Sequence, residues 1–85
     1  MSSILIYPNP NNGRFSIVDM GVMPGTIGTI QIHDLQDKRV ASKTFRSLPK
    51  LDFDFSDLET GTYFMKIDYG STKTYAKRLQ IFSNN

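Results

Sequence analysis

Apolar and polar residues alternate along most of this chain with a period of two, the pattern of β-strands that bury one face. In the clearest segment Leu51, Phe53 and Phe55 share one face, and aspartates occupy the other. No window keeps apolar residues at the spacing of an amphipathic helix. The predicted strands are 4–7, 14–18, 26–33, 39–45, 50–55, 62–69 and 72–82. This pattern predicts an all-β fold, an immunoglobulin-like antiparallel β-sandwich of about seven strands in one domain spanning 1–85, with 83–85 as a frayed tail.

In two of the predicted strands the alternation does not assign every side chain to the face that its polarity suggests. Val40 and Phe45 fall on opposite faces of their segment, so the buried face of that strand is ambiguous. Lys77 shares the phase of Tyr75 and Leu79, which the alternation places in the core. Two arrangements reconcile an ammonium group with that position: a β-bulge that re-aims the side chain, or a place at the rim with the charge in water.

The segment 8–13, with the sequence Pro-Asn-Pro-Asn-Asn-Gly, carries the densest turn signal of the chain. Pro8 and Pro10 cannot donate hydrogen bonds to a neighbouring strand, so they also blunt the edge of the sandwich. The pair formed by Asn12 and Gly13 readily takes positive φ. A ligand-binding loop is the alternative interpretation, although such a cluster more often forms only a turn.

A second turn precedes the sixth predicted strand, where Leu58, Gly61 and Tyr63 are spaced as in the tyrosine corner of immunoglobulin-like sandwiches. In that motif the phenol ring packs in the core and the hydroxyl bonds a backbone group a few residues upstream, here near Glu59. We also expect Gly61 to adopt a backbone conformation that is closed to other residues. Alternatively, Tyr63 is an ordinary half-buried strand tyrosine.

Composition narrows the functional classes. The 85 residues include no cysteine, which excludes disulfides, thiolate metal sites and a thiol nucleophile. The net charge is only +2 and the Lys and Arg residues are spread along the chain, unlike the basic stripe of a nucleic-acid-binding protein. No apolar run approaches the ~20 residues of a membrane span, and residues 1–6 lack the basic region and apolar core of a signal peptide.

Few side chains offer catalytic or metal-binding chemistry. His33 is the only histidine, and its neighbour Asp34 points to the opposite face of a strand, so we expect a rim histidine rather than a general base. Asp52 and Asp54 share a face but lack the roughly six to eight oxygen ligands that calcium takes. We expect them on a solvated face opposite Lys or Arg of a neighbouring strand. We therefore expect no catalytic residue, no cofactor and no metal, and hence no enzyme.

Taken in order, the motifs of the chain resemble those of one family. The residues that carry the resemblance are Tyr7, Pro8, Asn9, Pro10 and Gly13 near the start, Asp34 and Lys38 at a predicted hairpin, and Leu58, Gly61 and Tyr63 at the corner. A basic and then apolar segment, 77–81, ends the pattern. Over nearly its whole length the chain is similar to the C-terminal sorting domains of the type IX secretion system, also called the Por secretion system, of Bacteroidetes.

Two positions depart from the family pattern. Asp37 stands where the family commonly has glycine before the lysine of the hairpin, and aspartate tolerates left-handed φ better than most residues. His33 stands where an aromatic residue, usually tyrosine, often precedes the family aspartate. Neither departure removes the resemblance.

The resemblance implies that the domain is a transport signal. Such domains follow a cargo domain in the same protein, pass from the periplasm to the outer-membrane surface or the extracellular space through a dedicated translocon, and are usually removed by a surface peptidase. It also implies that the translocon recognises the last strand, because charged and apolar side chains together suit a receptor and a terminal strand can add to a partner's sheet. The residues concerned are Lys77, Arg78, Leu79, Gln80, Ile81 and Phe82. Alternatively, these residues only close the sandwich.

The rival hypothesis is a non-catalytic accessory sandwich of a secreted bacterial enzyme, of the fibronectin-like or carbohydrate-binding type. A carbohydrate-binding face would present an exposed row of aromatic side chains. Phe64 and Tyr69 lie on opposite phases of one predicted strand, so they do not form such a row. Of the two, only Phe64 is expected to be exposed.

Overall fold

The computed structural model describes residues 4–19, 23–70 and 74–82, and these residues form seven β-strands and no helix. The strands are β1 (Ile4–Tyr7), β2 (Arg14–Asp19), β3 (Ile27–His33), β4 (Arg39–Arg46), β5 (Lys50–Asp54), β6 (Gly61–Asp68) and β7 (Thr74–Ile81). The predicted all-β fold is confirmed. The predicted start of the last strand, 72–73, and the predicted frayed tail, 83–85, lie outside the described residues.

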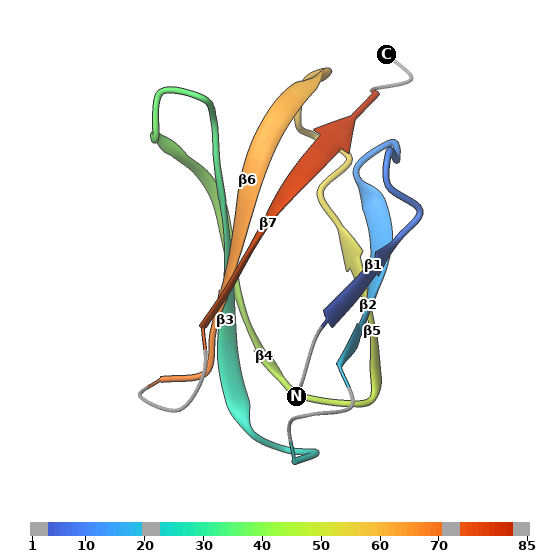
Figure 1. Cartoon of the computed structure of the whole chain (residues 1–85), viewed down its shortest axis with the longest axis vertical. Coiled ribbons are helices and arrows are strands. Elements are labelled where there is room, and N and C mark those ends of the chain that lie inside the picture. The colour runs from blue at the N-terminus through green and yellow to red at the C-terminus, as the bar shows by residue number, and fades with distance from the viewer. Residues whose placement is uncertain (1–3, 20–22, 71–73, 83–85) are drawn as a thin grey trace.

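The strands form two antiparallel sheets that face each other (Figure 1). One sheet has the order β1-β2-β5 and the other the order β4-β3-β6-β7. The chain crosses between the sheets after β2, after β4 and after β5, as in the Greek-key connections of immunoglobulin-like sandwiches. When the strands are lettered A to G, β6 is strand F, on which the tyrosine corner of that fold lies.

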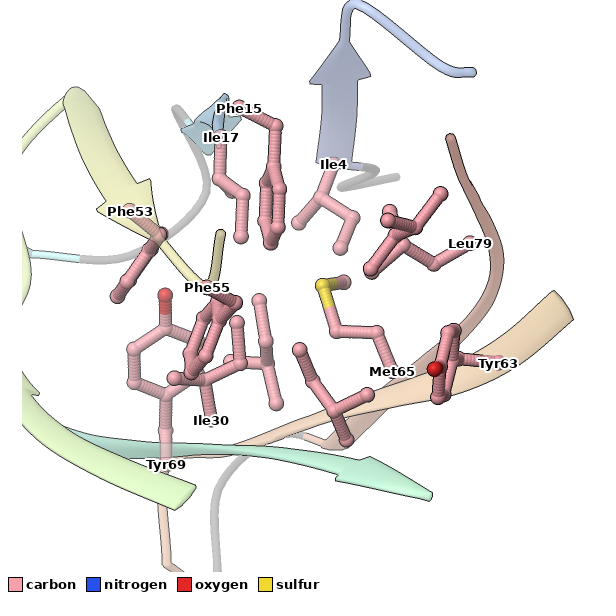
Figure 2. Close-up of a cluster of buried hydrophobic side chains, with 13 residues drawn as sticks. Ile4, Phe15, Ile17, Ile30, Phe53, Phe55, Tyr63, Met65, Tyr69 and Leu79 are labelled. Atoms are coloured by element: carbon pink, nitrogen blue, oxygen red, sulfur yellow. The ribbon is translucent and has the colours of Figure 1, made fainter. Parts of the chain in front are cut away.

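Side chains from both sheets fill the space between them (Figure 2). The buried apolar residues are Ile4, Phe15, Ile17, Ile30, Ile32, Phe53, Phe55, Tyr63, Met65, Ile67, Tyr69, Leu79 and Ile81. Alternate residues of the strands supply them, as the period of two predicts, and Phe55 and Tyr69 continue the alternation directly after β5 and β6. The rings of Phe15, Phe53 and Phe55 lie with their centroids 5.9, 6.0 and 6.1 Å apart. Burial of a large apolar side chain contributes roughly 1.5–3 kcal/mol, so this core is the main source of stability.

The structure explains both strands in which the alternation was ambiguous, the one with Val40 and Phe45 and the one with Lys77. The pairing of β3 with β4 shifts register between Ile32 and His33, and this irregularity leaves Val40 exposed while Phe45 packs against the core. The pairing of β6 with β7 is unbroken, so no bulge re-aims Lys77. Lys77 is exposed, which places its ammonium group at the rim of the sandwich.

The tyrosine corner predicted before β6 is present. The Tyr63 ring is buried in the core (Figure 2). Its hydroxyl donates a hydrogen bond of 2.7 Å to the backbone carbonyl of Glu59. Leu58 is partly buried and packs against the core. The expectation for Gly61 is wrong, because its φ is not in the left-handed region. Gly61 already belongs to β6 and pairs with Ile81, so it takes an extended conformation that other residues share.

The hairpin between β3 and β4 contains a left-handed residue at Asp37, with φ of 63°. The Asp34 carboxylate accepts hydrogen bonds from the N–H groups of Gln36 and Lys38, each of 2.9 Å. An aspartate therefore fills the position of the usual glycine, and the side chain of a second aspartate stabilises the turn.

Candidate recognition site at the last strand

The last strand, β7, forms one edge of the four-stranded sheet. Leu79 and Ile81 point into the core, and their exposed fraction is 0%. Lys77 and Arg78 are exposed, and Phe82, just beyond the strand, is 53% exposed. In the folded domain a receptor therefore reaches the charged pair and Phe82, whereas the two buried residues hold β7 in the sandwich. Recognition of this strand by a partner stays a prediction.

The outer edge of β7 is partly covered by the segment that follows β1. The Asn9 side-chain amide donates to the Arg78 carbonyl, and the Gln80 N–H donates to Asn9 Oδ1, both at 3.2 Å. A side-chain amide has a donor and an acceptor like a peptide group, so Asn9 takes the place of a neighbouring strand. The peptide bonds before Pro8 and Pro10, in the same segment, are both cis.

Asn11 continues this contact with its main chain. Its N–H donates to the Gln80 carbonyl at 3.0 Å, and its carbonyl accepts from the Phe82 N–H at 2.7 Å. Asn11 thereby forms a parallel bridge with Ile81. We call the contacts of Asn9 and Asn11 with residues 78–82 the asparagine clasp.

The side chain of Asn11 holds the clasp segment in shape. It is buried, its Nδ2 donates to the Pro8 carbonyl at 2.9 Å, and its Oδ1 accepts from the Gly13 N–H at 2.8 Å. Gly13 has φ of +97°, and a Cβ placed on it would lie 2.7 Å from the Phe55 carbonyl oxygen. Only glycine fits this position, because both the φ and the close approach of the backbone exclude a side chain.

Sequence reasoning predicted the turn at 8–13 but not the clasp. Asn9 and Arg78 are 69 residues apart, and asparagine beside proline is an ordinary turn signal. Two features together could have indicated the contact of Asn9 with the last strand. The strand predicted at 72–82 ends the chain and can lie at a sheet edge, and the prolines of segment 8–13 prevent that segment from pairing with it as a regular strand. An asparagine amide is one of the few side chains that can pair with the exposed backbone of such a strand.

His33 and Asp54 lie where the sequence predicts, whereas Asp52 lies opposite Ser16, which donates a hydrogen bond to it, and not opposite a Lys or Arg. His33 is at the rim, with Nε2 3.2 Å from Gln31 Oε1 and Nδ1 3.3 Å from the Asp37 carboxylate. Asp54 faces solvent and pairs with Arg14 of the neighbouring strand at 3.3 Å. Hydrogen bonds from Ser56 lower the pKa of the Asp54 carboxyl below its ordinary value.

The described part of the chain contains neither a metal-binding cluster nor a membrane-spanning helix. In residues 4–19, 23–70 and 74–82, no group of three or more His, Cys, Asp or Glu side chains is arranged to hold a metal ion. Over the same residues no helix has the length and apolar character needed to cross a membrane.

Comparison with known proteins gives one positive result. A family model described as a secretion system C-terminal sorting domain matches residues 5–81, which is most of the 85-residue chain. The match includes β2 to β7, the clasp segment and the tyrosine corner. No curated protein matches the chain significantly.

Proposed function

The chain belongs to the family of type IX secretion C-terminal sorting domains, and we propose that it directs an upstream cargo protein through the type IX outer-membrane translocon. Domains of this family are sorting signals rather than catalysts. The observation that carries the proposal is the family match over residues 5–81 together with an edge strand that presents the exposed pair Lys77 and Arg78. On this route the cargo passes from the periplasm to the outer-membrane surface or the medium.

The proposed contact with the translocon uses the part of β7 that remains accessible. Lys77 and Arg78 supply positive charge, and Phe82 supplies an apolar contact. Charge of one sign speeds encounter with a complementary partner, and a buried aromatic side chain is a common source of affinity. Leu79 and Ile81 contribute indirectly, because their burial fixes the direction in which the neighbouring side chains point.

Addition of a partner strand to β7 is restricted by the asparagine clasp. Backbone groups of one strand point alternately to its two neighbours, and those of Gln80 face away from β6 toward Asn9 and Asn11. By the same alternation Thr74 and Ala76 also direct backbone groups away from β6, and these groups bond no described residue on that side. A partner strand therefore pairs first with this half of β7 and reaches 78–82 only after the clasp opens.

Removal of the domain by a surface peptidase is also part of the proposal. Ile4 is buried in the core, so from β1 onward the chain is tied into the sandwich. Proteases act on exposed, unpaired backbone, and the proposed cleavage site therefore precedes β1. After cleavage at this position, the released cargo would no longer carry the sandwich domain.

The rival function, carbohydrate binding, gains no support from the arrangement of the exposed aromatic residues. Tyr7 ends β1, Phe64 lies on the outer face of β6, and Phe82 follows β7. Tyr7 belongs to the other sheet, and the cross-strand neighbours of Phe64 are His33 and Arg78, so these aromatic residues do not form the row on which a sugar chain stacks.

Fusion to a foreign passenger tests the proposal. A passenger with an ordinary signal peptide, followed by this chain, should reach the surface or the medium of a Bacteroidetes cell. The matched controls are the passenger without the chain and the fusion in a strain without a functional type IX translocon; in both, the passenger should stay in the periplasm. Retention of the intact, folded fusion in the periplasm of the unaltered strain would contradict the proposal.

A further inference from the structure

The outer face of the four-stranded sheet presents an aromatic side chain among cations. The strand register places Arg39 of β4, His33 of β3, Phe64 of β6 and Arg78 of β7 in one row across the sheet. Lys66 follows Phe64 by two residues and shares its face. Directly opposite residues on one face of a sheet lie within reach of one another, so these five side chains form one continuous surface.

The cations of this surface are not neutralised. Arg39, Lys66 and Arg78 are exposed, and none of them makes an ion pair with a described residue. On the outer face of the other sheet, by contrast, Asp54 neutralises Arg14. Lys50 on that face also lacks an ion pair with a described residue, but it is a single cation, whereas the outer face of the four-stranded sheet carries Arg39, Lys66 and Arg78 beside one carboxylate, Asp68.

Phe64 gives this face an apolar centre. Its exposed fraction is 48%, although it belongs to a strand whose alternate residues are in the core. Aromatic residues at the centre of a charged surface are typical anchors of protein–protein contacts. The ring is flanked across the strands by His33 and Arg78.

The spacing of the cations indicates the kind of partner. Three strand spacings separate Arg39 from Arg78, a distance of roughly 14 Å between backbones, and Lys66 lies about 7 Å along β6 from Phe64. Charges so dispersed do not converge on a single phosphate group. They suit carboxylates distributed along a protein segment, which arginine can bind through two parallel hydrogen bonds.

We propose that the outer face of the four-stranded sheet, centred on Phe64 and bordered by Arg39, Lys66 and Arg78, is a docking surface for an acidic protein segment. Phe64 packs against an apolar group of the partner, and the three cations bind its carboxylates. The inference goes beyond the proposed function, because binding of an acidic segment does not depend on whether the chain directs export.

Titration of the ¹⁵N-labelled chain with a random copolymer of glutamate and tyrosine tests the proposal. Saturable chemical-shift changes are expected at the amides of β3, β4 and β6. Phe64→Thr, which keeps a residue suited to strands, should weaken binding about tenfold or more, as loss of a central anchor does. The charge variant Arg39→Glu should weaken it too. The matched control Lys50→Glu, on the outer face of the other sheet, should bind like the unaltered chain.

Each variant is compared only after its thermal unfolding midpoint is shown to match that of the unaltered chain. If Phe64→Thr fails this check, Lys66→Glu takes its place, because that side chain is exposed and makes no ion pair within the described part of the chain. Shift changes confined to β1, β2 and β5, or an equal loss of affinity in Lys50→Glu, would overturn the proposal. Tighter binding of inorganic polyphosphate than of the copolymer would also overturn it and assign the face to phosphate.

Discussion

The Tyr63 hydroxyl donates a hydrogen bond of 2.7 Å to the backbone carbonyl of Glu59, four residues earlier in the chain. This bond fixes the end of the loop that carries the chain from the three-stranded sheet to the four-stranded sheet. The ring packs in the core while the hydroxyl reaches the loop, so one side chain ties the last crossover between the sheets to the sandwich.

Tyr63→Phe isolates the contribution of that bond, because the ring remains and only the hydroxyl is lost. We expect the free energy of unfolding to fall by about 1 kcal/mol, the usual net value of one hydrogen bond. Urea denaturation of both proteins measures the difference. An unchanged midpoint would mean that water satisfies the Glu59 carbonyl equally well.

The same residue predicts a loss of stability in alkali. Burial raises the pKa of Tyr63 above its ordinary value of 10.0, and the carboxylates of Glu59 and Asp34 raise it further. The unfolded chain therefore loses this proton at lower pH than the folded domain. The stabilisation is fully present below about pH 10 and is lost as the pH rises through the folded-state pKa. Urea titrations at about pH 8 and about pH 11 should show a smaller alkaline loss in Tyr63→Phe than in the unaltered chain.

Gly13→Ala should be clearly more destabilising than Gly25→Ala. Both glycines have positive φ, +97° and +88°, and such strain costs about 1–3 kcal/mol. Only at Gly13 would the new Cβ also meet backbone, 2.7 Å from the Phe55 carbonyl oxygen; at Gly25 no atom lies within 4 Å. A third variant, Gly61→Ala, should be tolerated, because its Cβ would make an ordinary contact at 3.6 Å with the Tyr63 ring. Thermal unfolding ranks the three, and equal effects at Gly13 and Gly25 would disprove the close approach.

Asn9→Ala should open one half of the asparagine clasp. The Gln80 N–H would lose its acceptor, so its hydrogen exchange should become faster by about fivefold, as the loss of a bond of about 1 kcal/mol predicts. The Leu79 amide faces β6 and should not change. Asn12→Ala is the matched control, because the Asn12 side chain accepts a hydrogen bond from the nearby Arg14 N–H and bonds no described residue of β7. Equal protection of Gln80 in both variants would contradict the clasp.

The double variant Lys77→Glu with Arg78→Glu tests the charged pair in export. Both side chains are exposed, so we expect the free energy of unfolding to change by no more than about 0.5 kcal/mol. If the translocon reads their charge, reversal should slow encounter and reduce surface delivery of a fused passenger. Arg46→Glu with Lys50→Glu, an exposed pair elsewhere, is the control of equal charge. Normal export of the variant with Lys77→Glu and Arg78→Glu would show that the translocon does not read these charges and that both residues only form a solvated edge.

Local patterns in the sequence were sufficient to predict the strands and the core. The alternation around Phe53 assigns a buried and an exposed face without any knowledge of the neighbouring strands. The tyrosine corner was also predictable, because Tyr63 and Glu59 are close in sequence. The conformation of Gly61 was not: the spacing of the motif does not specify where the turn ends, and β6 begins one residue earlier than predicted.

The site was predictable only in part, because its two halves come from opposite ends of the chain. The phase of Leu79 and Ile81 predicts their burial, and the structure places both in the core. The clasp depends on the position of β1 relative to β7, which follows from the packing of two sheets and not from the residues near Asn9. The same holds for the row on the outer face, since the neighbours of Phe64 are set by the register of four strands.

The parallel bridge between Asn11 and Ile81 affects how the domain resists a force applied to its two ends. The two paired segments run the same way, so tension that draws the beginning and the end of the chain apart slides one segment along the other. Hydrogen bonds loaded in this way carry the force together, whereas a hairpin pulled at its open end loses them one by one. A domain drawn by one end while the other end is held would therefore resist as a unit, and its lifetime under load would depend on the rate at which these few bonds break.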